Sequence, residues 1–205
     1  MIPTYYHPPP DPTDPSFDRE AWMVATIDGV NYSNQACAAM KEGRFEESIE
    51  LHKKALACKL RFHPPDSIQA AISYNGMGEA MLRTGKLQEA DEAFHKALPI
   101  REAGGPVLDA AVTRDNIGQL REMQGRFAEA REIRIRGSGE HMVCGYYYCP
   151  HSETVPQKNL KACASCQSVF YCTRECQKQD WNKRHKPLCQ GRQAEGEPSN
   201  QEAGQ

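Results

Sequence analysis

Cysteine is concentrated near the C-terminal end of this 205-residue chain. Of nine cysteines, seven fall in the last third: Cys144, Cys149, Cys163, Cys166, Cys172, Cys176 and Cys189. A secreted disulfide scaffold would spread its cysteines and tend towards an even number, whereas thiols clustered at short spacings in a reducing compartment are typically metal ligands. Together with His185 the block offers eight soft or borderline ligands, enough for two tetrahedral zinc sites.

The spacing of these ligands indicates how they are held. Cys172 and Cys176 are four residues apart, as are His185 and Cys189, so in a helix each pair lies on one face and can bind one ion. Residues 163–166 (Cys-Ala-Ser-Cys) have the form of a zinc-knuckle turn. Spacing alone does not choose between sequential pairing, which gives two independent zinc sites in series, and crossed pairing, which ties the segment into one compact unit.

Residues 144–189 resemble a MYND-type zinc finger almost throughout, most specifically from Cys163 onwards. The resemblance implies crossed pairing, with Cys144, Cys149, Cys172 and Cys176 on one zinc and Cys163, Cys166, His185 and Cys189 on the other. In RING and PHD fingers the histidine is usually the fourth or fifth ligand, but here it is the seventh, which disfavours ubiquitin-ligase chemistry. The first pair departs from the commonest family spacing, with four residues between Cys144 and Cys149 in place of two.

Both predicted zinc sites are closed by four protein ligands. A hydrolytic zinc keeps one position open for water, so we expect two structural Zn²⁺ ions and a non-enzymatic protein. Metal binding would supply the folding free energy that so short a block cannot obtain from burial alone. His141 and His151 flank the first pair and could replace a thiolate, but with every nearby cysteine placed they are expected to be exposed loop residues. Cys37 and Cys58 are interpreted as free thiols.

The charge of the predicted finger argues against nucleic acid as its main partner. Between Cys144 and Cys189 there are seven Lys plus Arg and three acids, a formal charge of +4. Seven thiolates with two Zn²⁺ contribute −7 + 4 = −3, which leaves about +1, a poor basis for neutralising phosphates. The basic run at residues 183–186 could still touch a phosphate, but a short charged face of this kind is usually only solvated.

The family resemblance implies a different partner, a proline-rich peptide held by Gln177 and Trp181. These residues are four apart on the final helix, so an indole that packs on pyrrolidine rings lies beside an amide that bonds to the peptide backbone. The alternative is that Trp181 only covers the small core with Phe170 and Tyr171. Ala164 stands at a knuckle position where some peptide-binding members have a serine.

The elements that precede the finger repeat themselves. Related six-residue segments begin at Gly43, Gly85 and Gly125, offset by 42 and 40 residues, and a fixed period in this range is typical of a solenoid. Apolar residues at helical spacing lie before and after Gly85, where a residue tolerant of positive φ would end one helix and turn the chain into the next. Residues 22–138 are therefore predicted to form about three helical hairpins.

These hairpins resemble the tetratricopeptide repeat in the longer-period form of kinesin light chains. The second unit matches best, at Gly78, Ala90, Phe94 and Ala97; the first places Ala36, Ser48, His52 and Ala55 there. The third keeps Gly118 and Ala130 but has Arg134 and Gly137 where Phe and Ala belong, so its second helix should be short or irregular. The resemblance implies a concave face that holds an extended peptide or a helix; the alternative is that the repeats only support the finger. Members of the family that bind acidic chaperone C-termini use Lys, Asn and Arg side chains at set positions on the first helices. That clamp is not found here: Asn116 matches the asparagine of the pattern in the third unit, but the equivalent position of the second unit is Gly76.

The whole chain thus indicates a mostly α protein, a helical-hairpin solenoid followed by a small cross-braced two-zinc finger. Residues 1–21, with six prolines, and residues 190–205 are expected to be disordered tails, and the N-terminal prolines could occupy a proline-binding surface of the same or a neighbouring copy. Lacking a signal peptide and a membrane span, the protein is expected inside the cell, in nucleus or cytoplasm.

We predict a protein-interaction adaptor. The alternatives are a nucleic-acid-associated transcriptional regulator, or a non-catalytic module related to SET-domain methyltransferases, in which the finger precedes the helical repeats.

Overall fold

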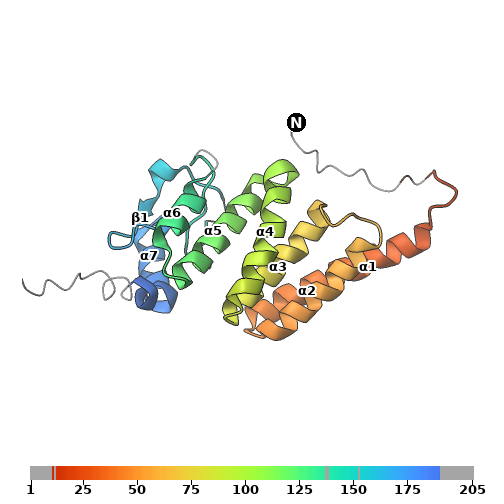
Figure 1. Ribbon diagram of the computed structural model, residues 1–205, viewed down its shortest axis with the longest axis horizontal. Coiled ribbons are helices and arrows are strands. Elements are labelled where there is room, and N and C mark those ends of the chain that lie inside the picture. The colour runs from red at the N-terminus through yellow and green to blue at the C-terminus, as the bar shows by residue number, and fades with distance from the viewer. Residues whose placement is uncertain (1–10, 12, 137–138, 152, 190–205) are drawn as a thin grey trace, which may run out of the picture.

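The computed structural model describes residues 11, 13–136, 139–151 and 153–189. The predicted disorder of residues 1–10, 12 and 190–205, the proposed role of the N-terminal prolines and the position of Gly137 lie outside the described residues. Six helices form the first part of the chain: α1 (Arg19–Lys41), α2 (Phe45–Leu60), α3 (Ile68–Arg83), α4 (Leu87–Gly104), α5 (Val107–Met123) and α6 (Phe127–Ile135). They stack as three consecutive antiparallel hairpins (Figure 1), which confirms the predicted solenoid.

The first helix begins earlier than the sequence suggested. The predicted tail extends to residue 21, but α1 starts at Arg19, because the Asp18 side chain accepts a hydrogen bond from the backbone N–H of Ala21 at 2.9 Å and caps the helix. A short acidic side chain before the first helical residue satisfies one of the N–H groups that a helix leaves unpaired at its start. Residues 19–21 therefore belong to the solenoid.

Each hairpin turns at a glycine in the left-handed region. Gly43, Gly85 and Gly125 have φ values of 78°, 75° and 74°. In all three turns the residue after the glycine donates its N–H to a carbonyl five residues back, as Lys86 does to Met81 at 2.9 Å. Other residues reach this conformation only with a steric penalty from Cβ, so the repeated glycine fixes the turn geometry that the sequence predicted.

The second hairpin packs through an aromatic ring against a glycine. A Cβ atom on Gly78 would lie 2.6 Å from the ring of Phe94, so only glycine lets α3 and α4 approach this closely. Phe94 is fully buried, in a cluster with Leu82, Leu98 and Leu120. Burying such a side chain stabilises the fold by about 1.5–3 kcal/mol.

The third hairpin has the same geometry with different chemistry. A Cβ atom on Gly118 would lie 2.6 Å from the guanidinium of Arg134, which occupies the place of the Phe94 ring. The second helix of this hairpin, α6, has nine residues, compared with 18 in α4. The predicted shortening of this helix is therefore confirmed, and the Arg134 guanidinium lies where the repeat normally buries an aromatic ring.

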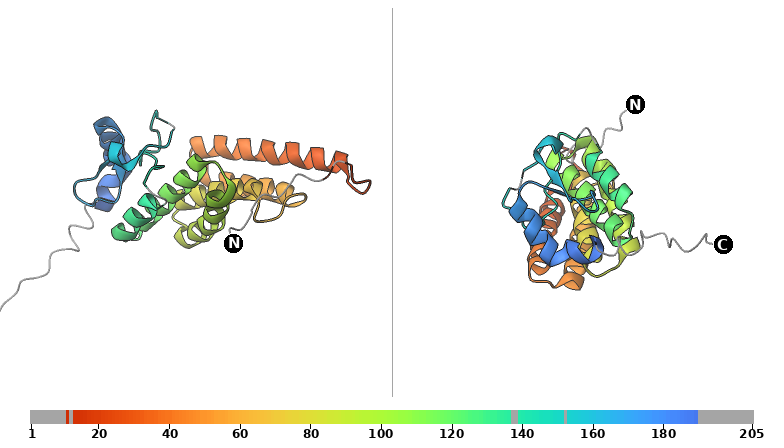
Figure 2. Two further views of the ribbon diagram at one scale, coloured as in Figure 1. Left: turned by 90° about the horizontal axis from the view of Figure 1, so that it is seen from above. Right: turned by 90° about the vertical axis from the view of Figure 1, so that its left-hand side faces the viewer.

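Residues 139–189 fold as a small unit at the end of the solenoid. After a bridge between Met142 and Val155, the chain forms the single turn η1 (Gln157–Asn159) and a two-stranded antiparallel sheet, β1 (Lys161–Ala162) with β2 (Phe170–Tyr171). It ends in α7 (Arg174–Asp180), which continues into the π-helical turn η2 (Trp181–His185). Figures 1 and 2 show this unit beside α5 and α6, at the opposite end of the molecule from the start of α1. No described helix is both long enough and apolar enough to cross a membrane.

Candidate metal centres and the repeat contact that supports them

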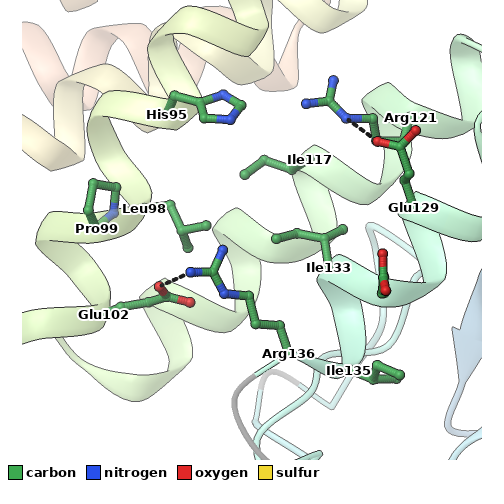
Figure 3. A pocket seen from close by; sticks show the side chains of 11 residues that line it. His95, Leu98, Pro99, Glu102, Ile117, Arg121, Glu129, Ile133, Ile135 and Arg136 are labelled. Atoms are coloured by element: carbon green, nitrogen blue, oxygen red, sulfur yellow. Dashed lines mark ion pairs between the residues drawn. The ribbon is translucent and has the colours of Figure 1, made fainter.

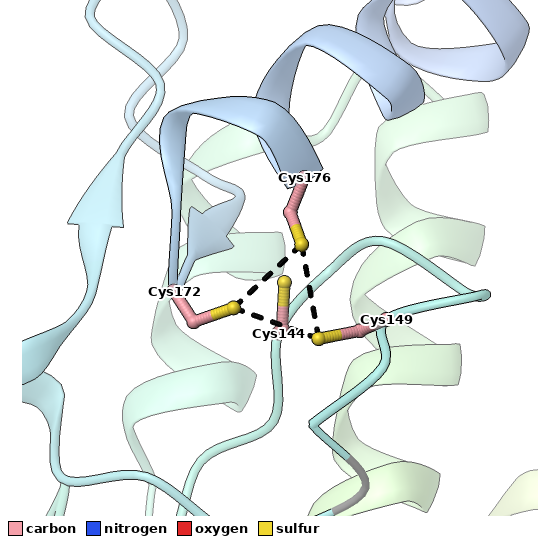
Figure 4. Close-up of side chains that lie close together, drawn as sticks. All are labelled: Cys144, Cys149, Cys172 and Cys176. Carbon is pink, nitrogen blue, oxygen red and sulfur yellow. Dashed lines mark hydrogen bonds between the residues drawn. The ribbon is translucent and has the colours of Figure 1, made fainter.

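The first ligand cluster brings together four cysteines from three places in the chain (Figure 4): Cys144, Cys149, Cys172 and Cys176. Their sulfur atoms all lie within 4.8 Å of one another. The Sγ of Cys149 lies 3.5 Å from that of Cys172 and 3.8 Å from that of Cys176, and Cys172 and Cys176 are 3.7 Å apart. Four sulfurs at about 2.3 Å from one zinc ion, at tetrahedral angles, lie about 3.8 Å apart. The cluster therefore fits a zinc ion.

The second cluster, of Cys163, Cys166, His185 and Cys189, is completely buried. The Nε2 atom of His185 lies 3.3 Å from the Sγ of Cys166. For a nitrogen at about 2.0 Å and a sulfur at about 2.3 Å from one zinc ion, the expected separation is about 3.5 Å. This site also fits zinc, with Nε2 as the ligand atom of the histidine.

The two clusters group the side chains in the crossed arrangement that the MYND resemblance implies, in which ligands from alternating parts of the chain share a site. That these eight side chains hold zinc stays a prediction. Burial raises the pKa of the Cys144 thiol, and it raises those of Cys149 and Cys189 to about 11. Such thiols stay protonated at neutral pH unless a nearby cation favours the thiolate, as a bound divalent ion does.

The remaining candidate ligands lie outside both clusters. His141 and His151 are exposed, as expected of loop residues, and the Nδ1 of His141 lies 3.4 Å from the hydroxyl of Thr154. Cys37 is exposed and Cys58 half-buried, both in helices of the first hairpin and both free thiols. None of these four side chains joins a metal cluster.

A buried carboxylate from the solenoid lies beside the second cluster. Glu122, on α5, has a fully buried side chain, and its Oε2 lies 3.8 Å from the Nδ1 of His185. It accepts hydrogen bonds from the Ser168 hydroxyl at 3.0 Å, from Arg184 at 2.9 Å and from Arg134. Metal-binding histidines typically present their second nitrogen to a carboxylate or carbonyl, which fixes the ring's orientation and tautomer. Here the Glu122 carboxylate of the repeat is the acid on that side of the ring, although 3.8 Å is longer than a hydrogen bond and the Nδ1 of His185 has no hydrogen-bond partner among the described residues.

The two arginines beside Glu122 extend this contact in both directions. Arg134 donates to the Asp115 carboxylate at 2.7 Å and to the carbonyl of Ser168, in the finger, at 2.8 Å. Arg184 donates two hydrogen bonds to Asp180, which also accepts one from the Tyr171 hydroxyl at 2.8 Å. We call the group Asp115, Glu122, Arg134, Ser168, Asp180 and Arg184 the buried ion network.

Charge balance within the network favours ionised groups. Burial by itself raises the pKa of Glu122, but attraction by Arg134 and Arg184 outweighs it and holds the pKa at about 2. A pair of this kind is costly to break from one side, because the remaining charge is left buried without a partner. The network therefore fastens the finger to the last hairpin in one orientation.

Sequence reasoning missed this network. Arg184 was expected to be solvated with its basic neighbours, which is wrong, because its side chain is only 16% exposed and binds Glu122 and Asp180. Arg134 was noted only as an irregularity. The signal that could have revealed it is a guanidinium at the one position where the repeat requires a buried ring, which calls for a buried acid nearby.

The predicted peptide-binding residues both lie on the finger's last helical segment and are half-buried. Trp181 packs against a cluster that includes Tyr171 and Val169, and its ring centre lies 5.8 Å from that of His185. Phe170 packs elsewhere, with Met142 and Leu160, so the expectation that it shares the Trp181 core is wrong. The indole therefore supports the finger and keeps part of its surface open.

A cavity whose lining contains no residue of the metal clusters lies between α4, α5 and α6 (Figure 3). It has a volume of about 700 Å³, with Leu98, Ile117 and Ile133 among its lining side chains. Ion pairs of Arg121 with Glu129 and of Arg136 with Glu102 flank it. Its lining joins α4, which has 18 residues, to α6, which has nine.

Comparison with known proteins finds two families in the chain, a tetratricopeptide repeat at residues 30–103 and a MYND finger at residues 143–189. Egl nine homolog 1 of Mus musculus is 54% identical over 37 residues, which is 18% of this chain and 9% of that protein. Its counterpart from Homo sapiens is 56% identical over 34 residues, 17% of this chain and 8% of that protein. The chain thus spans less than a tenth of these relatives, and no solved structure matches it. The chain therefore carries tetratricopeptide repeats followed by a MYND finger.

Proposed function

We propose that this protein is a non-enzymatic adaptor that holds one protein partner on its finger and a second on its repeats, with two structural zinc ions maintaining the finger. Repeats and MYND fingers are both protein-interaction modules. The observation that carries the proposal is the buried ion network, which fixes the finger on the last hairpin. Two binding surfaces held in one relative orientation can bring two partners together at a defined distance.

The finger's proposed ligand is a proline-rich peptide, bound at Gln177 and Trp181. Both side chains are partly exposed, and their spacing of four residues places them on one face. Proline-rich segments are already extended before binding, so they lose little conformational entropy on an aromatic surface.

The contacts of the basic run at residues 183–186 favour a protein ligand over nucleic acid. Of its four residues, Arg184 is committed to Glu122 and Asp180, and Lys183 donates to the Tyr146 hydroxyl at 3.2 Å. His185 belongs to the second cluster, so the run presents the charges of two exposed lysines, Lys183 and Lys186, which is a small basis for neutralising phosphates. The clustered thiols favour a reducing compartment, so we place the protein in the nucleus or cytoplasm.

The test uses tryptophan fluorescence. The chain has two tryptophans, so Trp22→Phe leaves Trp181 as the single reporter. A peptide with a leucine between proline pairs should shift its emission to shorter wavelengths in a saturable way, and Gln177→Ala should weaken binding by about fivefold, the loss of one hydrogen bond of about 1 kcal/mol. A glycine-serine peptide of equal length is the control. An emission spectrum that does not respond to the proline-rich peptide would contradict the assignment.

The non-enzymatic part is tested separately. We expect no transfer of a methyl group from labelled S-adenosylmethionine to histone or bulk protein substrates. Transfer above background that disappears on mutation of Cys163→Ser would overturn the non-enzymatic part of the proposal.

A further inference from the structure

The unusual first cysteine pair of the finger places three tyrosines beside the repeats. The segment between Cys144 and Cys149 reads Gly145-Tyr146-Tyr147-Tyr148, two residues longer than the commonest spacing of the family. Gly145 anchors it, donating its N–H to the Phe170 carbonyl at 2.8 Å, and a Cβ there would lie 2.4 Å from the Val169 side chain. The guanidinium of Arg83, on α3, lies over the Tyr147 ring at 5.0 Å. This tyrosine loop (residues 145–148) therefore reaches across to the first helices of the hairpins.

A cavity of about 270 Å³ lies between the tyrosine loop and the helices α3 and α5. Repeat and finger both line it, the repeat through Glu79, Asn116 and Leu108, for example, and the finger through Tyr146, Tyr147 and the zinc-cluster residues Cys144 and Cys149. The space is slightly smaller than the ~300 Å³ at which pockets for drug-sized ligands begin. This volume suits one long side chain of a partner.

The charge of the cavity is one-sided. Its described lining includes the acids Glu79, Asp115 and Glu153 and no lysine or arginine. Asp115 is neutralised by Arg134 at 2.7 Å, which leaves Glu79 and Glu153. Tyr146 and Tyr147 also line the cavity, and aromatic faces attract cations: Lys183 already lies over one face of the Tyr146 ring at 5.6 Å and Arg83 over one face of the Tyr147 ring at 5.0 Å.

Glu79 is the central acid of this lining. Its Oε1 accepts hydrogen bonds from the amides of Asn116 at 2.8 Å and Asn75 at 3.3 Å, and among the described residues it forms no ion pair. Burial raises the pKa of Glu79 and outweighs the attraction of Arg101 and Arg83, which lie outside the lining. Glu79 is hydrogen-bonded by neutral amides and forms no ion pair among the described residues, so a guest cation in the cavity would add a close counter-charge.

We propose that this cavity binds the ammonium group of a lysine side chain on an extended segment of a protein partner, with Glu79 as the counter-ion and Tyr146 and Tyr147 as the walls. The inference deepens the proposed function, since it names the chemistry of the second partner, and it rests on the repeats being a binding surface. The pocket is composite: the tyrosine loop is held between two zinc ligands, so the lysine site exists only while the finger is folded.

The test is an NMR titration of the full-length, zinc-loaded, ¹⁵N-labelled protein. The probe is the peptide acetyl-Ala-Ala-Lys-Ala-Ala-amide, and the matched control replaces lysine with norleucine, which keeps the alkyl chain and removes the charge. We expect saturable shifts at residues 79, 116, 146 and 147 with the lysine peptide and none with the norleucine peptide. Equal shifts with both peptides, or shifts spread over exposed acids elsewhere, would overturn the proposal.

Variants locate the site. Glu79→Gln should weaken lysine-peptide binding by about tenfold, because the amide keeps the shape and removes the counter-ion, whereas Glu89→Gln, at an exposed acid of α4, should leave it unchanged. Tyr147→Leu should weaken it by about threefold through loss of an aromatic wall. Unchanged binding in both Glu79→Gln and Tyr147→Leu would place the peptide elsewhere and refute the assignment.

Two further measurements separate this inference from the proposed function. A strong chelator should abolish lysine-peptide binding, and persistence of binding without zinc would refute the composite pocket. Trp181→Ala should weaken binding of the proline-rich peptide and leave binding of the lysine peptide unchanged. If the wild-type protein binds the lysine peptide but not the proline-rich peptide, the finger's proposed ligand is wrong and the cavity assignment stands; if it binds the proline-rich peptide but not the lysine peptide, the cavity assignment is wrong.

Discussion

The second and third hairpins fill the same position with opposite chemistry. Phe94 lies over Gly78 in an apolar cluster, whereas Arg134 lies over Gly118 in a network of buried charges. A phenylalanine needs only apolar neighbours, and Phe94 finds them in its own hairpin and on α5 of the next one, at Ile117 and Leu120. A buried arginine requires carboxylates and carbonyls, and part of that requirement is met by the finger, at the Ser168 carbonyl. The arginine thus makes the third hairpin depend on polar partners, part of which lie in the finger, whereas the second hairpin needs only apolar contacts.

Removal of zinc should have the largest effect, and it should destabilise the third hairpin while leaving the second hairpin intact. Apparent binding free energies of structural zinc are about 10–16 kcal/mol, so a strong chelator should unfold residues 140–189. Because Arg134 and Glu122 lose their partners in the finger, protection of α5 and α6 from hydrogen exchange should fall as well, while α3 and α4 stay protected. Hydrogen exchange with mass spectrometry measures this directly. A finger that stays protease-resistant after chelation would refute the structural role of the metal.

Mutation of the two buried positions should distinguish their roles. Phe94→Ala should cost about 3–5 kcal/mol of unfolding free energy through a cavity, and zinc affinity should not change. Glu122→Gln should cost about 2–4 kcal/mol, because Arg134 and Arg184 lose a counter-charge, and it should weaken zinc binding by about 10–100-fold through His185. Denaturant unfolding and competition with a zinc indicator provide both readouts.

An exposed acid is the control for the Glu122 variant. Glu129→Gln removes a carboxylate from α6 that pairs with Arg126 at the surface, and it should change stability by less than about 1 kcal/mol. If Glu122→Gln behaves like Glu129→Gln in both measurements, the proposed coupling between repeat and finger is wrong.

The first hairpin extends the comparison with a third chemistry and a smaller effect. His52 stands at the position of Phe94 and Arg134; it is buried, and a Cβ on Gly76 would clash with its ring. Burial, helped by the nearby Lys59 charge, lowers the pKa of His52 from 6.5 to about 4. Between pH 6.5 and pH 4, His52 is therefore protonated in the unfolded chain but neutral in the folded chain. The free energy of unfolding should fall as the pH decreases from about 6.5 to 4, by at most about 3 kcal/mol.

His52→Gln provides the matched comparison for this pH dependence. The amide cannot titrate, so the difference in unfolding free energy between wild type and variant should shrink or change sign as the pH falls from 7 to 5. Measuring the difference cancels contributions from zinc ligands, which titrate in both proteins. A difference independent of pH would show that the His52 imidazole stays accessible to protons in the folded state.

Much of the fold followed from local spacing. Gly43, Gly85 and Gly125 were expected to end helices, and they do so because a left-handed turn depends on a few adjacent residues. The mismatch at Arg134 also predicted a short α6. The start of α1 was predicted three residues late because one capping side chain, Asp18, decides it.

The sequence by itself determined the set of candidate zinc ligands and the three hairpins, since both are written in spacings of a few residues. Only the tertiary structure decided what joins them. Arg184 and Glu122 are 62 residues apart, and Tyr147 meets Arg83 across an even longer interval, so no local pattern records these contacts. Buried ion pairs and pockets between the repeats and the finger form only when the two units pack together. Their residues therefore depend on how α5 and α6 contact the finger, and not on the spacing within either unit.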